Sequence, residues 1–192
     1  MLTNEKIDTL QHLLEEISGA DDTYYIKMSD EEFEKASRRW DEPTKNHTLH
    51  QRQIGSVAFQ SECAQRLMST INDPAELQWL IENYNYDDGR WLPTQIINHP
   101  QCDIMTALTT YYGLQPDYIY EKYETLEQAK TDPYMKETAY LMSTIEDKSK
   151  QGVFQKVLPF PDHLWDLVSP DIDFTKPPYN KVPPQLMLPK AG

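Results

Sequence analysis

The sequence predicts an all-α fold of stacked helical hairpins, arranged as a solenoid-like array or an irregular bundle, with an extended proline-rich C-terminal tail. Apolar residues recur at steps of three and four through most of the chain. Aspartate-proline pairs at 73–74 and 132–133 are typical of helix starts. No alternating apolar run is bounded by a hairpin turn, because Asp88-Gly89 is flanked by helix-period segments. We expect one helical domain over residues 1–169 and a tail over 170–192.

The first predicted helices lie between residues 7 and 42. Four apolar residues fall on one face of the first: Ile7, Leu10, Leu14 and Ile17. Ser29 and Glu32 form a capping box that opens a second helix. Its inward residues should be Phe33, Ala36 and Trp40. Glu42-Pro43 should end this helix, because proline disfavours a helical residue before it.

The longest apolar pattern covers residues 54–71 and predicts a central, well-buried helix. Its inward face should be Ile54, Val57, Ala58, Ser61, Ala64, Leu67, Met68 and Ile71.

Three further helix starts follow. Asp73-Pro74 with Glu76 resembles a capped start, and the inward residues after it should be Leu77, Leu80, Ile81 and Tyr84. Asp103 can cap a helix that contains Ala107, Leu108 and Tyr111, and Gly113 can end it. Asp132-Pro133 should start a last helix, which buries Met135, Ala139, Met142 and Ile145.

The chain changes character after Ser169, where six prolines fall within the last 23 residues. Such a segment forms neither a helix nor an inner strand. Two interpretations remain: a free proline-rich ligand, or a segment that wraps over the helical body. Apolar residues favour wrapping, because disordered tails are usually poor in them; they are Phe174, Tyr179, Leu186 and Met187.

Charge excludes several classes of function. The chain has 18 basic and 31 acidic residues and a net charge of −13. This charge repels phosphates, so we expect no nucleic acid partner, whereas it would steer a basic protein partner.

No apolar run approaches the roughly 20 residues that cross a bilayer, and no secretory signal is visible. Cys63 and Cys102 are too few for a disulfide framework. We therefore expect a cytoplasmic protein with no membrane contact and no cofactor.

The corner NYNYDDGRWLP, residues 83–93, crowds aromatic and acidic residues around one glycine. Gly89 can supply a backbone conformation that other residues rarely adopt, and Asp87 or Asp88 can bond back to nearby amides. Pro93 suits the first turn of a following helix, which Pro100 would close. A purely structural corner is therefore one interpretation.

The run from LQWLIENYNYDDGRWLP through IINHPQCDIMTALTTYY resembles the bacterial domain-of-unknown-function family 4274. The match falls on residues 83–89, 93, 99–103 and 106–108, within about residues 75–118. Tyr86 departs from it, because tryptophan is commoner there in the family. The resemblance marks a fold and implies no activity, although small proteins of this kind resemble genes found near bacterial toxins.

Metal binding and hydrolysis are the weaker chemical hypotheses. His47-x-x-His50 and His99-x-x-Cys102 each have ligand spacing, but the pairs are far apart in sequence and lack a paired CxxC. Asp87, Asp88 and His99 could position a water, yet no nucleophile elbow or phosphate-binding glycine loop is present. Neither cysteine has a local base signature. We expect no metal site and no catalytic residue.

Recognition of a protein is the favoured hypothesis, because interfaces concentrate tyrosine, tryptophan and arginine. The expected partner-binding residues are Tyr84, Tyr86, Asp87, Asp88, Arg90, Trp91, Tyr118, Tyr120, Tyr123 and Glu124. The function expected is that of an acidic, non-catalytic immunity protein, which neutralises a toxin by filling its basic active-site cleft. The alternatives are a stacked-helix scaffold that binds a peptide and, less favoured, a metal-dependent hydrolase.

Overall fold

The computed structural model describes residues 2–18, 25–167 and 172–188; the side chains of residues 16–18, 60, 88, 162 and 163 lie outside this description too. Within these ranges the elements are α-helices and 3-10 helices, and the one β-type pairing is an isolated bridge between Asp103 and Gln155. The predicted all-α class is confirmed. The chain divides into two compact units, residues 1–70 and 71–192.

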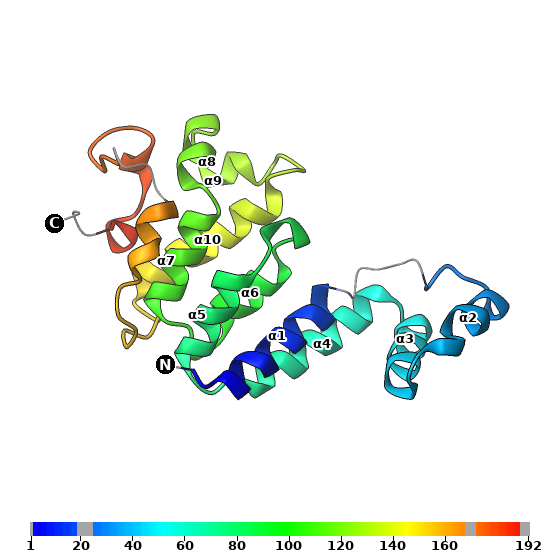
Figure 1. Cartoon of the computed structure of the whole chain (residues 1–192). Helices are drawn as coiled ribbons and strands as arrows, with labels where there is room; N and C mark the ends of the chain where they lie inside the picture. Colours follow the sequence, from blue (N-terminus) through cyan, green and yellow to red (C-terminus); the bar gives the residue numbers. More distant parts are fainter. Residues whose placement is uncertain (1, 19–24, 168–171, 189–192) are drawn as a thin grey trace. The chain divides into compact units, whose positions relative to one another are not determined.

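The described part of the first unit contains the helices α1 to α4 (Figure 1). Helix α1 (Asn4–Ser18) packs on α4 (Ser56–Thr70), and α4 also packs on α3 (Glu42–Ile54). Helix α2 (Asp30–Ala36) continues into the 3-10 turn η2 (Ser37–Arg39). The predicted capping box is present, since the Ser29 hydroxyl accepts from the Glu32 amide and the Glu32 carboxylate accepts from the Ser29 amide at 2.9 Å.

Arg52 of α3 fastens the segment before α2. Its guanidinium donates to the Met28 carbonyl at 3.0 Å and to the Asp30 carboxylate at 2.7 Å. The same group lies 4.7 Å from the centroid of the Phe33 ring, which is buried. Of the other two residues expected inward on this helix, Trp40 is half-buried and Ala36 is exposed.

The inward face predicted for residues 54–71 is confirmed at Ala64, Leu67 and Ile71 and is wrong nearer the start of α4. Val57 is 84% exposed, and Ala58 and Ser61 are exposed as well. The buried residues of α4 are Phe59, Cys63, Ala64 and Leu67. Phe59, which was not expected to face inward, packs edge-to-face on His47 of α3 with ring centroids 4.7 Å apart. Within its unit α4 contacts both α1 and α3.

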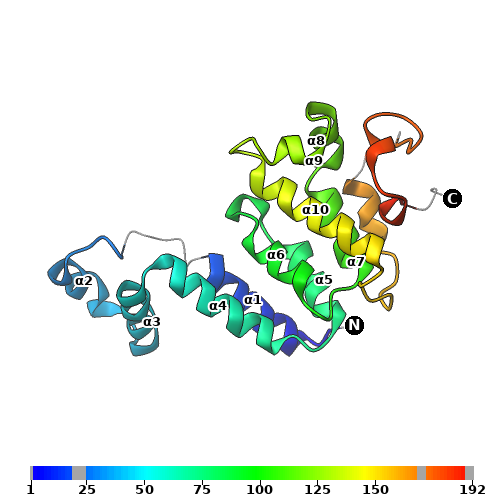
Figure 2. The same ribbon diagram turned by 180° about the vertical axis from the view of Figure 1, so that it is seen from behind.

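The second unit is an irregular bundle, the second of the two predicted arrangements (Figures 1 and 2). Helices α5 (Pro74–Asn83), α6 (Trp91–Asn98) and α7 (Ile104–Gly113) pack on one another. Helix α10 (Lys136–Gln151) contacts α6, α7 and the short α9 (Leu126–Ala129), and α9 also contacts α8 (Pro116–Lys122). Helix α10 therefore joins segments that lie far from it in sequence.

Aspartate caps start α5 and α7 as predicted. The Asp73 carboxylate accepts from the Ala75 amide at 2.8 Å, and the Asp103 carboxylate accepts from the Met105 amide at 2.9 Å. The inward residues expected on α5 are all buried. Asp103 is fully buried, and its second oxygen accepts from the amides of residues 157 and 158. It therefore also fixes the chain that follows α10.

The start of α10 differs from the prediction. Asp132 accepts from the Tyr134 amide at 2.9 Å and forms a turn, and the α-helix begins four residues after Asp132, at Lys136. The Asp132 carboxylate also accepts from the Tyr123 hydroxyl. The N-cap residue of α10 is Met135, so the aspartate-proline pair makes a turn before the helix and not the helix cap itself. Ala139, Met142 and Ile145 are buried as expected, whereas Met135 is half-buried.

Two glycines have distinct roles around the corner at residues 83–93. Gly89 has φ +99° and ψ −164°, a region that essentially only glycine occupies, so the predicted special conformation is confirmed. Gly113 ends α7 at a close approach: a Cβ there would lie 3.1 Å from the hydroxyl oxygen of Tyr86. The Asn85 side chain bonds back to an amide of the corner, since it accepts from the Asp87 amide at 3.1 Å, whereas the Asp88 side chain lies outside the described residues.

Residues 172–188 contact the helices of the second unit. The Tyr179 hydroxyl donates to the Asp117 carboxylate at 3.2 Å, and the Tyr112 hydroxyl donates to the Leu186 carbonyl at 2.8 Å. The segment contains the 3-10 turns η5 (Tyr179–Lys181) and η6 (Pro184–Leu186), which contact α8 and α10. Tyr179 and Leu186 are buried, whereas Phe174 and Met187 are half-buried. These contacts agree with a wrapped segment.

Replacing Gly89 by asparagine should destabilise the protein by about 1–3 kcal/mol, because its backbone region excludes a Cβ atom. The matched control is Gly152→Asn, at φ +65° and ψ 31°, a left-handed region that asparagine tolerates. Urea unfolding of both variants measures the difference. Equal losses of stability would contradict this account of the corner.

Candidate functional site

The corner at residues 83–93 uses most of its own side chains internally. Tyr84 is buried, and its hydroxyl donates to the Gly89 carbonyl at 3.2 Å. The Tyr86 ring packs edge-to-face on Tyr84 with centroids 5.7 Å apart. Burial raises the pKa of the Tyr86 phenol, so its hydroxyl stays protonated. Asp87 is exposed, and the Asp88 side chain lies outside the description.

Arg90 fastens this corner to α10. Its guanidinium donates to the Thr138 hydroxyl at 3.1 Å, to the Gly89 carbonyl at 3.2 Å and to the Tyr86 carbonyl. It also lies 5.6 Å from the centroid of the Tyr86 ring. These contacts hold the guanidinium in one place. Arg90 can therefore line a binding surface, but its guanidinium is not free to reach out to a partner.

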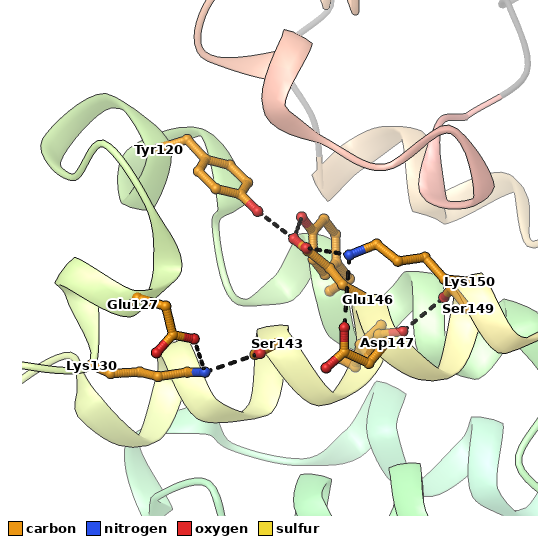
Figure 3. Close-up of polar contacts among 10 residues, drawn as sticks. Tyr120, Glu127, Lys130, Ser143, Glu146, Asp147, Ser149 and Lys150 are labelled. Atoms are coloured by element: carbon orange, nitrogen blue, oxygen red, sulfur yellow. Dashed lines mark hydrogen bonds and ion pairs between the residues drawn. The ribbon is translucent and has the colours of Figure 1, made fainter.

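A buried carboxylate on α10 forms the polar centre of the second unit. Glu146 is 7% exposed. One of its oxygens, Oε1, accepts from the Tyr111 hydroxyl at 2.8 Å and from the Tyr120 hydroxyl (Figure 3). Its Oε2 lies 3.7 Å from Nζ of Lys150. Through this carboxylate, α7 and α8 are both tied to α10.

The two tyrosines of this cluster are held in their neutral form. Burial raises the pKa of Tyr111, and the neighbouring Tyr120 and Glu146 raise it further. Burial also raises the pKa of Tyr120, together with its hydrogen bond to Glu146. A buried carboxylate with two such donors is fully satisfied on one oxygen, which offsets the cost of removing its charge from water.

A pocket of about 410 Å³ lies between α8, α9 and α10, and Glu146 is one of its lining residues. We name it the acidic pocket. Its carboxylates are Glu124, Glu127, Glu146 and Asp147, and its ammonium groups are Lys150 and Lys181. Lys150 is shared between Glu146 and Asp147, each at 3.7 Å. Four carboxylates face two ammonium groups in the lining, and Lys130 at the edge pairs with Glu127, so the pocket carries a small net negative charge.

Lys130 crosses the edge of this pocket. Its Nζ atom lies 2.5 Å from the Glu127 carboxylate and donates to the Ser143 hydroxyl at 3.1 Å (Figure 3). The same atom lies 5.0 Å from the centroid of the Tyr140 ring. One ammonium group therefore reaches both the pocket carboxylate and an aromatic ring farther up α10.

Lys181 brings the C-terminal segment into the acidic pocket. Its ammonium donates to the carbonyls of Tyr120 at 2.9 Å and Tyr123 at 3.2 Å. These carbonyls lie at the C-terminal end of α8, where a cation is favourable. The segment therefore supplies part of the pocket wall and stabilises the helix that carries Tyr120.

The second predicted cluster, at residues 118–124, divides between two environments. Tyr120 and Glu124 line the acidic pocket. Tyr123 donates its hydroxyl to Asp132, and this hydrogen bond lowers the pKa of the Asp132 carboxyl. Tyr118 is 47% exposed, and the Lys122 ammonium lies 5.8 Å from its ring centroid. Tyr118 and Tyr123 are outside the pocket lining.

The predicted corner residues line two other pockets. Tyr84 and Tyr86 line a pocket of about 400 Å³ with Thr109, Gly113 and Leu167. Arg90 and Trp91 line a pocket of about 310 Å³ between α6 and α10, which we name the aromatic pocket. Six of the ten predicted binding residues therefore line three separate pockets, two at each. Asp87, Tyr118 and Tyr123 line none of these three pockets, and the Asp88 side chain lies outside the described residues.

The predicted metal ligands have other roles. His50 pairs with Glu62 at 2.8 Å, and His47 packs on Phe59, so both fasten α3 to α4. The His99 ring nitrogen accepts from the Gln101 amide at 3.1 Å. Cys102 is buried, and its thiol donates to the Asp103 carbonyl at 3.7 Å. In the described part of the chain, no group of three histidine, cysteine, aspartate or glutamate side chains could hold a metal ion.

Sequence reasoning missed Glu127, Glu146, Asp147, Lys150 and Lys181. Glu146 could have been found, because it lies on the same helix face as Ala139 and Met142, at spacings of three and four residues. A carboxylate on an apolar stripe requires buried donors. Lys181 carried no such signal, because its role depends on how the C-terminal segment returns to α8.

Comparison with protein families confirms the resemblance seen in the sequence. Residues 72–149 match the model of a family described as Domain of unknown function (DUF4274). The matched residues run from the start of α5 through most of α10, so they include the corner and Glu146 but not Lys150 or Lys181. No curated protein and no solved structure matches the chain. In the part of the chain that the structure describes, no helix combines the length and apolar character needed to cross a membrane.

Removing the Glu146 side chain should leave two buried hydroxyls without an acceptor. We expect Glu146→Ala to lower the free energy of unfolding by about 2–4 kcal/mol. Glu146→Gln should cost less, because a neutral acceptor remains. The matched control is Asp147→Ala, at the exposed neighbouring position, which should change stability by less than about 0.5 kcal/mol. Denaturant unfolding distinguishes them, and an equal loss for the alanine variants at 146 and 147 would contradict the network.

Cys102 should be inert toward thiol reagents in the folded protein. Burial raises the pKa of the Cys102 thiol to about 12, and the thiolate is the reactive form. In a Cys63→Ser background, labelling by a chromogenic disulfide at pH 8 should be far slower in the folded protein than in urea. Labelling of the folded protein at the rate of a free thiol would refute this.

Proposed function

We propose that this chain is a non-catalytic binding protein whose second unit recognises a basic protein partner through the acidic pocket. The observation that carries the proposal is the net-negative lining of that pocket above a carboxylate fixed by two tyrosines. A fixed carboxylate loses little conformational freedom when a cationic side chain arrives, which favours affinity. Tyr120 and Glu124, two of the residues expected from sequence, belong to this lining.

The overall charge supports the same proposal. A net charge of −13 speeds encounter with a basic surface, and exposed carboxylates at the rim act mainly on this encounter rate. Glu124 and Asp147 are exposed rim residues of this kind. The partner would therefore be attracted over a distance and then oriented by the pocket.

The corner has a different place in the proposal. Tyr84 and Arg90 bond to carbonyls of their own corner, so we propose that they shape the surface and do not bind the partner directly. Asp87 is exposed and stays a predicted contact, with Asp88 beside it. Trp91 and Tyr118 also stay predicted contacts.

The most concrete version is a cytoplasmic immunity protein that covers the basic active-site cleft of a toxin. In that version the carboxylates of the acidic pocket stand in for the phosphates of a nuclease substrate. This version is motivated by the resemblance of small proteins of this kind to genes found near bacterial toxins. The carboxylates of the acidic pocket would match the positive charge of the toxin's cleft. A peptide-binding scaffold is the alternative, and it would bind with little dependence on salt.

The test is to mix the purified chain with the basic proteins encoded next to its gene and to measure complex formation by calorimetry. We expect a stoichiometric complex that weakens steeply between low and high salt. Replacing Glu124 and Glu127 by glutamine and Asp147 by asparagine should weaken it by about tenfold or more. A toxin partner should also lose its activity in the complex.

The control variant removes equal charge from the first unit: Glu5→Gln, Asp8→Asn and Glu42→Gln, at three exposed positions. Equal weakening by both triple variants would mean that net charge alone acts, which would refute a specific acidic pocket. A further variant, Asp87→Ala, tests the corner separately. If it weakens binding and the pocket variant does not, the partner binds at the corner instead.

A further inference from the structure

The aromatic pocket between α6 and α10 has the composition of a protein-binding surface. Trp91 lines its α6 side, and Tyr140 and Leu141 line its α10 side. Tyr140 is 51% exposed, and Trp91 is half-buried. Tryptophan, tyrosine and arginine residues carry much of the binding energy in interfaces. The fixed Arg90 guanidinium forms the edge of this pocket.

The aromatic pocket and the acidic pocket meet along one face of α10. Tyr140 and Thr144 line the aromatic pocket, whereas Ser143 and Asp147 line the acidic pocket. These residues are three or four apart across the two pockets, so they lie on one face of the helix with Cβ atoms about 5–6 Å apart. The linings of the two pockets are therefore neighbours on α10.

The contacts of Lys130 show that a lining residue of the acidic pocket lies close to a lining residue of the aromatic pocket. Its ammonium touches the Glu127 carboxylate of the acidic pocket and lies 5.0 Å from the ring centroid of Tyr140 in the aromatic pocket. A single cationic group thus contacts a lining residue of each pocket at once. A short partner segment can do the same with two side chains.

We propose that the two pockets form one docking surface, and that the partner segment carries a bulky apolar side chain beside basic residues. The apolar side chain occupies the aromatic pocket, and the basic residues face the acidic pocket. Charge complementarity selects this occupant: the exposed carboxylates of Glu124 and Asp147 in the acidic pocket and of Glu137 in the aromatic pocket repel acidic segments, and a purely basic segment leaves the aromatic pocket unfilled. This inference rests on the proposed function and adds the chemical character of the partner.

Two synthetic peptides of equal charge test it: KGKGWGKGK, and the same sequence with the tryptophan replaced by glycine. At low salt, calorimetry should show that the tryptophan peptide binds the full chain at least about fivefold more tightly. In the Tyr140→Ser variant this preference should disappear. In the matched control Tyr134→Ser, whose tyrosine is 89% exposed and lines neither pocket, the preference should remain.

The outcomes separate this inference from the proposed function. Equal affinity of the two peptides for the unchanged chain, or a preference that survives Tyr140→Ser, would overturn the role of the aromatic pocket and leave the acidic pocket standing. Loss of the preference in Tyr134→Ser as well would also overturn it. If neither peptide binds, or if the acidic-pocket variant binds both as tightly as the unchanged chain does, the proposed function itself fails.

Discussion

A carboxylate that is buried on a helix must find hydrogen-bond donors inside the protein, and Glu146 imposes this constraint on the second unit. Its position on the apolar stripe of α10 places the charge toward the core. Tyr111 of α7 and Tyr120 of α8 meet the requirement with their hydroxyls. This polar contact therefore joins α7 and α8 to α10 and favours the arrangement in which both hydroxyls reach the carboxylate.

The same contact determines the candidate surface. Because Tyr120 is held on Glu146, α8 and α9 stand beside α10 and leave the acidic pocket between them. Lys181 then caps α8 and brings residues 172–188 to the pocket wall. At the other end of α10, Arg90 bonds to Thr138 and fixes the corner that borders the aromatic pocket. Two internal polar contacts along one helix thus position both pockets.

Features of the fold that depend on local chemistry were predictable from sequence. The Ser29 capping box, the Asp73 and Asp103 caps and the conformation of Gly89 each follow from a few neighbouring residues. The inward residues of the first half of α4 were not, because Phe59 and its contact with His47 depend on how α3 packs. The division of six predicted binding residues among three pockets depends likewise on contacts across the bundle. Glu146 was predictable in part: its place on the buried face of the helix follows from its spacing, but its two tyrosine partners do not.

The account depends most on the coupling between Glu146 and the tyrosine hydroxyls that hold it. A double-mutant cycle measures this directly, with Tyr120→Phe, Glu146→Gln and the double variant compared by urea unfolding. We predict that the two effects on the free energy of unfolding are not additive and differ from their sum by about 1 kcal/mol or more. Additive effects, within about 0.3 kcal/mol, would contradict the claim that this buried carboxylate organises the unit and its pockets.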